Sequence, residues 1–466
     1  MHSTAENTSK KWDATTNASR LLLLFSALVV MTFTRGGLSQ TSAALMALAG
    51  AALAAGVALL HPIAVRDLVR LRRAELTLIG TLLLAGLMFS AGTLALALAD
   101  LASPLWFSVI AVYTILGLAA ARPLGRRLTR MTWAFPLFLI AHTAATVVFL
   151  RWSPAVIDVQ VFLHDGATAV LHGHNPYTMT FPNIYPSQLS DLFYGPGVVM
   201  NGRITYGLPY LPVSLLVAIP GQLMGDVRYS QLIAMLVTAV VLRQLASDQV
   251  GRAAAVLGVA SVSAIPLLFG AWTEPTLVAL LACLVLALER RRYSFVAVFL
   301  GLFLVSKQYV VIAIPVLWLI RGWLTRRVIL MSLGVASAMT LPFFLADPAA
   351  FWKAIVEFQL VQPFRADSLS LLVSSVNTFG WPPPWTYGVL PLVGGGLTAI
   401  ALALRAPRTP AAFAAAIGLT LLVTILLSKQ AFMNYYFLVS GAFLIAAVAW
   451  PTHHQLANPP PGRIEV

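Results

Sequence analysis

Charged residues are scarce in this chain of 466 residues, and cysteine is almost absent. Charged side chains make up 10% of the sequence and hydrophobic ones 59%, whereas a soluble domain carries about 25% charge. Such a chain cannot cover its apolar surface with polar residues, which excludes a soluble fold and predicts an all-α integral membrane protein surrounded by lipid. The single cysteine, Cys283, excludes an intrachain disulfide bond.

The chain is nevertheless basic, with a formal net charge of +14. Its arginines stand in short clusters between apolar runs, which is the pattern of cytoplasmic loops that fix the orientation of membrane helices. We therefore expect the lipid bilayer, and no nucleic acid, as the partner of this charge.

Apolar runs predict a polytopic helical bundle of about 12–14 transmembrane helices. The runs lie near residues 20–38, 42–61, 76–98, 104–121, 133–150, 208–224, 229–247, 253–270, 273–288, 294–320, 327–345, 385–404, 410–427 and 431–449. Two long polar loops, 151–206 and 347–384, separate groups of these runs.

Clusters of basic residues follow the second and the fourth run. Their members are Arg66, Arg70, Arg72 and Arg73, and then Arg122, Arg126, Arg127 and Arg130. Because such clusters stay in the cytoplasm, we expect the N-terminal tail, residues 1–20, inside and loop 151–206 outside. The first helix is expected to stay uncleaved. The expected organisation is then N-terminal helices over 21–132, a main module over 133–449 and a cytoplasmic tail over 450–466.

Two of the apolar runs carry residues that interrupt a helix. Run 208–224 contains three prolines, which favours a broken or re-entrant helix. Run 294–320 is interrupted by Ser306-Lys307-Gln308, which predicts two short helices that meet at the outer surface. With these two breaks, both polar loops, Glu274 and the lysine-containing breaks all face outward. Charged groups at a membrane tend to be functional, so this gathering predicts one shared site.

Two acids follow the fifth run. Asp158 lies just past the membrane exit, where a carboxylate could take a proton from an acceptor hydroxyl as a general base. The alternative is a helix cap or an ion-pair partner. Asp165 follows seven residues later, so it lies on nearly the same face if this stretch is helical. It either binds acceptor hydroxyls or acts as a second catalytic carboxylate, or it is a capping or solvated residue.

Two matching sequences, Lys307-Gln308 and Lys429-Gln430, each follow a serine at the break or end of an apolar run. An ammonium in such surroundings needs an anion or water, and a lipid phosphate is a natural partner. The alternative is that both lysines reach the interface to be hydrated. Arg365 can make a forked contact to a phosphate, or it can pair with Asp367.

Other polar candidates stand beside apolar runs. Glu274 is either a partner of a substrate or of a lysine, or a buried contact that stabilises helix packing. Asn434 and Tyr435 are either ligand contacts or interfacial anchors. Three histidines in loop 151–206 lack a further ligand at a diagnostic spacing, so we expect no metal site.

Three short motifs stand in order in the outer loop and at the start of the next helix. They are Asp158-x-x-Val161-Phe162, Gly173-x-Asn175-Pro176-Tyr177 and the Tyr/Pro-rich stretch Tyr206–Pro212. In this order they resemble the GT-C superfamily of membrane glycosyltransferases. Within it, the chain is similar over about residues 133–449 to bacterial mannosyltransferases that use polyprenol-phosphate mannose.

The resemblance implies an inverting, metal-independent transfer without a cofactor. A mannose-like or arabinose-like sugar would move from a polyprenyl-phosphate donor to a hydroxyl of a glycolipid or glycan acceptor, on the extracytoplasmic face of the cell membrane. Asp158 matches the position of the family's base. Lys307, Lys429 and Arg365 would hold the donor phosphate as charge builds on it. The other residues expected around the substrates are Asp165, Gln308, Gln430, Glu274, Tyr177, Asn434 and Tyr435.

A transporter or lipid flippase is the alternative function. Such proteins carry inverted repeats and place their binding charges at the bilayer midplane, whereas the polar groups here gather toward one face. The two Ser-Lys-Gln sequences are the only internal match found. A non-catalytic membrane scaffold is a third interpretation. The acids and histidines of loop 151–206 argue against it.

Overall fold

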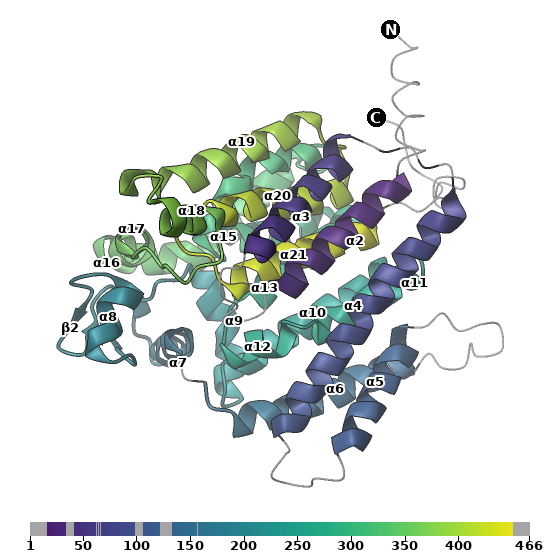
Figure 1. Ribbon diagram of the computed structural model, residues 1–466. Coiled ribbons are helices and arrows are strands. Elements are labelled where there is room, and N and C mark those ends of the chain that lie inside the picture. The colour runs from purple at the N-terminus through teal and green to yellow at the C-terminus, as the bar shows by residue number, and fades with distance from the viewer. Residues whose placement is uncertain are drawn as a thin grey trace.

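The predicted apolar runs form helices in the computed structural model, which describes residues 16–33, 42–61, 63, 65, 67–97, 106–121, 133–155 and 157–450 (Figure 1). Before the first polar loop, these helices are α2 (Thr16–Phe33), α3 (Ser42–Leu60), α4 (Leu68–Ala97), α5 (Trp106–Ala121) and α6 (Ala134–Trp152). The predicted tails up to residue 15 and from 451 onward, Arg66 and the basic cluster within 122–132 lie outside the described residues.

The main module continues the bundle from residue 212 to residue 449. Its apolar helices are α9 (Pro212–Leu223), α10 (Arg228–Leu245), α11 (Gln249–Ala260), α12 (Ala264–Phe269), α13 (Glu274–Glu289), α14 (Tyr293–Leu304), η2 (Gln308–Ile320), α15 (Arg326–Ala346), α19 (Val389–Arg405), α20 (Pro410–Leu426) and α21 (Met433–Ala449).

The expected class, a polytopic helical membrane protein, is confirmed by the length and composition of these helices. Among the described residues, six helices are long and apolar enough to cross a bilayer, and the bent pair of α9 and α10 adds a seventh candidate. Six shorter apolar helices of 10–17 residues accompany them. A total of about 12–14 crossings therefore requires the shorter helices to cross as well.

Both predicted helix breaks are confirmed. The axes of α9 and α10 differ by 107° at their junction, and α9 contains Pro220. Between α14 and η2, the backbone at Lys307 is extended. The Oγ of Ser214 donates to the carbonyl oxygen of Ser306 at 2.6 Å. This bond satisfies a buried backbone group that the break leaves without a helical partner.

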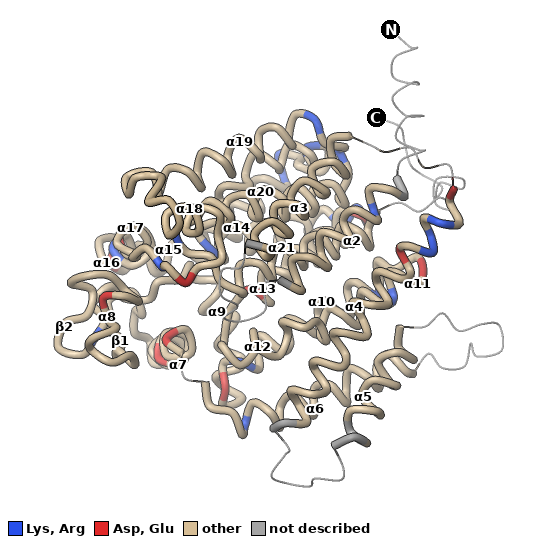
Figure 2. The backbone as a smooth tube through the Cα atoms, viewed as in Figure 1, with Lys and Arg blue, Asp and Glu red and all other residues tan. Residues whose placement is uncertain are grey.

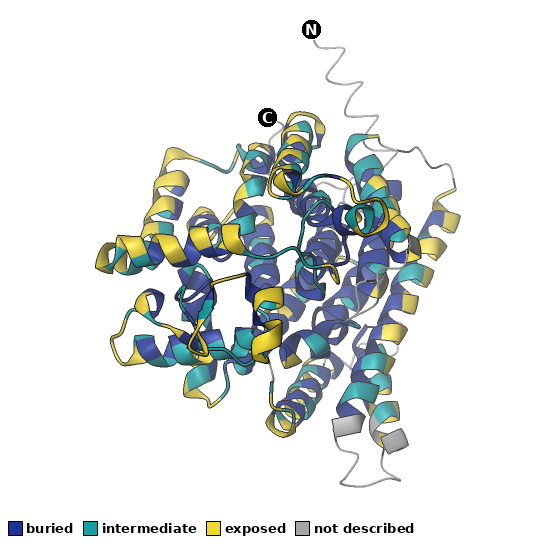
Figure 3. Cartoon of the chain, turned by 60° about the vertical axis from the view of Figure 1, so that its left-hand side comes forward, coloured by how far each residue is buried: buried dark blue, intermediate teal, exposed yellow. Residues whose placement is uncertain are grey.

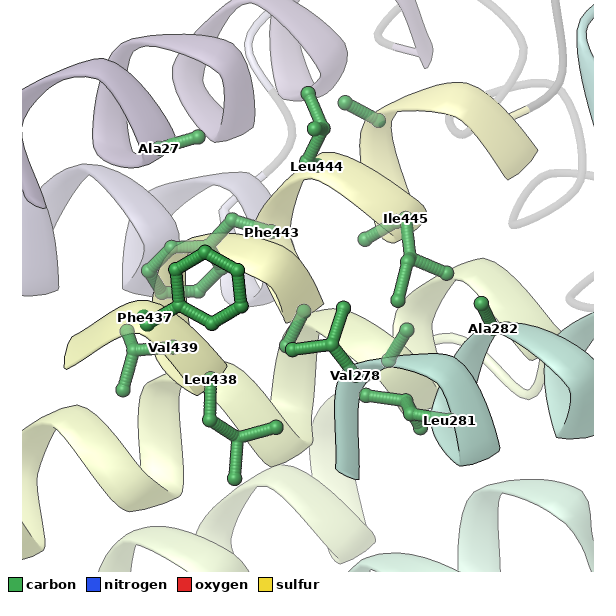
Figure 4. Close-up of a cluster of buried hydrophobic side chains, with 14 of the residues drawn as sticks. Ala27, Val278, Leu281, Ala282, Phe437, Leu438, Val439, Phe443, Leu444 and Ile445 are labelled. Carbon is green, nitrogen blue, oxygen red and sulfur yellow. The ribbon is translucent and has the colours of Figure 1, made fainter. Parts of the chain in front are cut away.

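The core of the bundle lies where α13, α20 and α21 pack against one another (Figure 4). Val278 and Leu281 of α13 interleave with Leu438 and Ile445 of α21 in this cluster. The two helices approach closely at Gly441, where an added Cβ would lie 2.8 Å from the Val278 side chain. Buried residues fill the middle of the bundle, and exposed ones lie on its outer helices and loops (Figure 3).

A buried charge network joins the N-terminal helices to the main module. Arg20 of α2 donates to both carboxylate oxygens of Asp248 at 2.7 and 2.9 Å. Arg72 of α4 reaches Asp248 at 2.7 Å and Glu75 at 3.1 Å. Burial raises the pKa of Asp248, but the two arginines hold it below its usual range. The starts of α4 and α11, which carry these charges, lie far from α7 and α8 (Figure 2).

The two polar loops are largely ordered, and they pack on each other. The first loop contains α7 (Asp158–Leu171), η1 (Pro176–Thr178), β1 (Phe181–Pro182), α8 (Ser187–Tyr194), β2 (Val199–Met200) and β3 (Arg203–Ile204). The second loop contains α16 (Pro348–Trp352), the π-helix η3 (Lys353–Glu357), α17 (Phe358–Val361), α18 (Leu371–Phe379) and η4 (Pro384–Thr386). The strands form a small antiparallel sheet in the order β1-β3-β2, which the all-α expectation lacked.

One hydrophobic cluster holds the two loops together. Phe162 and Phe181 of the first loop join Phe351 and Phe358 of the second in it. Gly195, at φ +92°, lies so close to α17 that a Cβ there would meet the Val361 carbonyl oxygen at 2.6 Å. This contact sets the position of α8 over the end of α17.

Candidate active site

A cavity of about 320 Å³ lies where both polar loops meet the break between α14 and η2 and the start of α21. It is lined by Ile157, Asp158, Val159, Phe162, Tyr185, Phe193, Tyr194, Pro209, Tyr210, Trp272, Lys307, Phe358, Gln359, Gln362, Arg365, Gln430, Phe432, Asn434 and Tyr435. The wall thus brings together Asp158, Lys307 and Arg365, which are far apart in the sequence and which the sequence marked as candidates.

Asp158 is the first residue of α7, and it is half-buried at the cavity wall. Its Oδ1 accepts a hydrogen bond from its neighbour, the backbone N–H of Val159, at 2.8 Å. Burial raises the pKa of this carboxyl group, while Tyr194, Tyr185 and the charge of Arg365 lower it in part. The net effect is a carboxylate that accepts a proton more readily than an exposed one, as a general base must.

Lys307 lies at the break between α14 and η2, and it is only 7% exposed. Its Nζ is 3.4 Å from Oε1 of Glu274 and 4.3 Å from the centre of the Tyr210 ring. Both flanking segments, α14 and η2, are apolar helices, and Lys307 has an extended backbone between them. The break in the helix therefore allows the ammonium group to line the cavity. Lys307 therefore reaches a carboxylate inside the protein rather than the interfacial water.

Arg365 lies in the loop after α17, between two aromatic rings. Its guanidinium is 4.6 Å from the ring centre of Phe193 and 4.9 Å from that of Phe432. It also makes a forked contact to Asp367, with distances of 2.8 and 2.7 Å. The backbone N–H of Arg365 donates to the carbonyl oxygen of Lys429 at 3.2 Å. Arg365 thus joins the first polar loop to the segment before α21.

Lys429 faces a second cavity, of about 220 Å³, between η2, α19 and α20. Its ammonium donates to the carbonyl oxygen of Gln362, and burial lowers its pKa. The cavity is lined by Tyr309, Gln359, Gln362, Tyr387, Gly388, Pro391, Leu421, Thr424, Ile425, Ser428, Lys429, Gln430 and Tyr435. The two lysines of the Ser-Lys-Gln sequences therefore line two neighbouring cavities, Lys307 the first and Lys429 the second.

The two cavities share one wall, made of Gln359, Gln362, Gln430 and Tyr435. Nε2 of Gln430 donates to the carbonyl oxygen of Pro363 at 3.0 Å and to Oε1 of Gln362 at 3.3 Å. Nε2 of Gln362 is buried without a hydrogen-bond partner. We call these three glutamines and the tyrosine the amide wall. Because each amide both donates and accepts, the wall can bind hydroxyl groups from either side.

Four predicted site residues, Asp165, Tyr177, Gln308 and Glu274, do not line either cavity. Asp165 is half-buried on α7, farther along the helix than Asp158. Tyr177 is buried, and its hydroxyl donates to the carbonyl oxygen of Tyr210 at 2.8 Å. Gln308 donates to the carbonyl oxygen of Pro209 at 2.9 Å. Tyr177 and Gln308 thus support the cavity wall at 209–210 from behind, while Asp165 is not among the residues that line the cavity.

Glu274 lies behind the wall, whereas Asn434 and Tyr435 are part of it. Nδ2 of Asn434 donates to Oε1 of Glu274 at 2.9 Å. Among the described residues, no group of three or more His, Cys, Asp or Glu side chains could hold a metal ion. The residues that sequence reasoning missed are mainly Tyr185, Phe193, Tyr194, Tyr210, Gln359 and Gln362. The density of aromatic residues in 177–210 is the one signal in the sequence that points to several of them.

Comparisons with known proteins give one match. No family model matches the chain, and no curated protein does. Among solved structures, the chain is similar to the crystal structure of ArnT from Cupriavidus metallidurans bound to undecaprenyl phosphate, with a TM-score of 0.44 and 18% sequence identity. The match covers 68% of this chain and 60% of that one, so it spans less than two thirds of ArnT.

Proposed function

We propose that the chain is a membrane glycosyltransferase of GT-C type, which transfers a sugar from a polyprenyl-phosphate donor to an acceptor hydroxyl. The observation that carries the proposal is that Asp158, Lys307 and Arg365 line one cavity. A proton acceptor and two cations around one void are what a transfer from a phosphate leaving group needs. The short motifs around Asp158 and Tyr177, which resemble those of the GT-C superfamily, also support the proposal.

The proposed reaction is a single displacement with inversion. Asp158 takes the proton of the acceptor hydroxyl, and the oxygen forms a bond to the anomeric carbon of the donor sugar. The bond from that carbon to the phosphate oxygen breaks, and its electron pair leaves with the polyprenyl phosphate. Lys307 and Arg365 stabilise the negative charge that develops on the phosphate, since cations in a partly dehydrated site act strongly.

The second cavity suits the lipid part of the donor. Leu421, Ile425 and Pro391 give it apolar walls, and α19 beside it exposes large apolar side chains such as Leu392 and Leu397. An isoprenoid chain can thus pass from the bilayer into the cavity beside this helix. Lys429 lies next to the amide wall at the polar end of this cavity. The donor would place its chain in the second cavity and its sugar in the first.

The outer side of the membrane is the proposed location of the site. The start of α4 and the end of α19, which carry the described basic residues Arg72 and Arg405, lie away from α7 and α8 (Figure 2). Loops that keep many arginines stay inside, which would place the cavity outside. A cysteine introduced at Asp191 of α8 and one at Arg405 are expected to react with a membrane-impermeant reagent in intact cells only at position 191.

The test of the function uses purified protein in lipid nanodiscs, with a panel of polyprenyl-phosphate mannose, glucose and arabinose donors and membrane-lipid acceptors. A new glycosylated product detected by mass spectrometry, lost in Asp158→Asn, is the expected result. Accumulation of a lipid or sugar in sealed vesicles without any covalent product would instead establish transport, and it would overturn the proposal.

A further inference from the structure

Glu274 is a completely buried acid that lies just behind the main cavity. It is the first residue of α13, and its Oε1 accepts from Tyr309 at 3.2 Å and from Asn434 at 2.9 Å. Nζ of Lys307 lies 3.4 Å from the same oxygen. Oε2 is buried without a hydrogen-bond partner. One oxygen therefore gathers three donors, while the other accepts no hydrogen bond.

A buried acid with an unused oxygen is costly, so its persistence needs a reason. Helix packing alone does not supply one, because a glutamine of the same shape would avoid burying the charge. The charge itself is what distinguishes Glu274 from glutamine, and its charged neighbour is Lys307. The relevant question is what Lys307 would do without it.

The two cations of the cavity are arranged in the same way. Lys307 is paired with Glu274, and Arg365 is paired with Asp367. Both cations line the cavity, and neither of their carboxylate partners does. Among the described residues, Asp158 takes part in no ion pair, although it lines the same cavity as both cations. Each cation is thus occupied by an acid that lies outside the cavity.

Only a few other groups act on Asp158. Those that face it are Tyr185 and Tyr194 from the first outer loop, Tyr210 before α9, Arg365 from the second loop and Tyr435 of α21. The groups that face Glu274 are Lys307, Tyr309, Asn434, Tyr210 and Tyr435. Lys307 is therefore the charge that is paired with Glu274 and that lines the same cavity as Asp158.

We propose that Glu274 is a positioning residue that holds Lys307 away from Asp158, so that the carboxylate of Asp158 stays unpaired and free to accept a proton. A lysine that reached Asp158 would favour the charged carboxylate and make it a weaker base. When an anionic donor phosphate enters, Lys307 can turn from Glu274 toward it over the Tyr210 ring. The inference deepens the proposed function and rests on it.

The test measures the protonation of Asp158 in Glu274→Gln. The released ammonium and the lost negative charge both stabilise the Asp158 carboxylate, so its titration moves to lower pH by about one unit. In the transfer reaction, this shift appears as a kcat that is retained at a lower pH than in the wild type. A carbodiimide that modifies protonated carboxyl groups, followed by mass spectrometry of Asp158 across pH, reports the same shift without any donor.

Two further variants separate charge from folding. Glu274→Asp keeps the negative charge and is expected to leave the midpoint of Asp158 labelling unchanged. The double variant Glu274→Gln, Lys307→Met removes the freed cation and is expected to return the midpoint to the wild-type value. Equal shifts in Glu274→Asp and Glu274→Gln, or no shift in Glu274→Gln, would overturn the proposal.

The labelling assay keeps this inference distinct from the function. If wild-type protein transfers no sugar from any polyprenyl-phosphate donor while Asp158 labelling shifts as expected, the proposed function fails and the role of Glu274 stands. If transfer occurs and the labelling midpoint does not move, the function stands and the role of Glu274 is wrong.

Discussion

Nη2 of Arg228 donates a hydrogen bond to the carbonyl oxygen of Leu150 at 2.7 Å, which ties the start of α10 to the end of α6. Nη1 of the same guanidinium donates to the carbonyl oxygen of Ser153 at 2.7 Å, and Asp226 holds its other side. The segment fixed in this way leads into α7. Arg228 therefore helps to set the position at which α7 starts, and Asp158 is the first residue of that helix.

Replacing Arg228 with leucine is therefore expected to destabilise the protein by about 3 kcal/mol, because the largely buried Asp226 is left without its partner. The thermal unfolding midpoint of the detergent-solubilised protein checks this. Arg151→Leu, at an exposed position of the same region, is the control and should leave the midpoint nearly unchanged. Equal midpoints for the two variants would refute a structural role for Arg228.

Asp158→Asn is expected to lower kcat by about 10²–10⁴-fold while the protein remains folded. In the wild type, kcat should fall as the pH drops through the pKa of Asp158. Because burial raises this pKa, the fall should occur at a higher pH than an exposed aspartate would give. The pH profile of product formation measures it, and a rate that is flat down to pH 4 would contradict the assignment.

The chain length of the donor should matter only through the second cavity. Ile425→Trp fills this cavity, so transfer from a long-chain polyprenyl-phosphate sugar should fall at least about tenfold, equivalent to about 1.4 kcal/mol of binding. A donor with a single short isoprenoid chain should be affected little. Ile400→Trp, on the exposed face of α19, is the matched control. Equal losses with both donors would show that the lipid binds elsewhere.

The close approach of α13 and α21 makes Gly441 sensitive to a single methyl group. Gly441→Ala is expected to cost about 1–3 kcal/mol, because the new Cβ meets Val278 in a packed core. Gly396→Ala on α19, where no atom lies within 4 Å of the added Cβ, should instead gain about 0.5–1 kcal/mol from helix propensity. Thermal unfolding of the two variants should give shifts of opposite sign.

Most of the helical frame could be predicted from the sequence, since long apolar runs have few alternatives in a membrane. The breaks between α9 and α10 and at Lys307 could be predicted for the same reason, because prolines or a charge inside an apolar run are conspicuous. Lys307 and Arg365 were found because charges are scarce.

The rest of the site depends on contacts between distant loops, which no local pattern reveals. Tyr194 and Gln362 come together only because the first polar loop packs on the second around Phe162 and Phe358. Asp165 was expected beside Asp158 because seven residues return a helix to the same face. The same seven residues advance the helix by about 10 Å. Of the two acids, only Asp158, at the N-terminal end of α7, therefore lines the cavity.

The network around Arg20 has a consequence for the order in which the protein assembles. Arg20 is synthesised long before Asp248, its forked partner, which is 228 positions further along the chain. The first helix thus reaches the bilayer with a guanidinium whose main counter-charge does not yet exist. The ion pair that joins α2 to the main module cannot form until Asp248, just before α11, has been synthesised, and chains truncated before that point are expected to be targets for quality-control proteases.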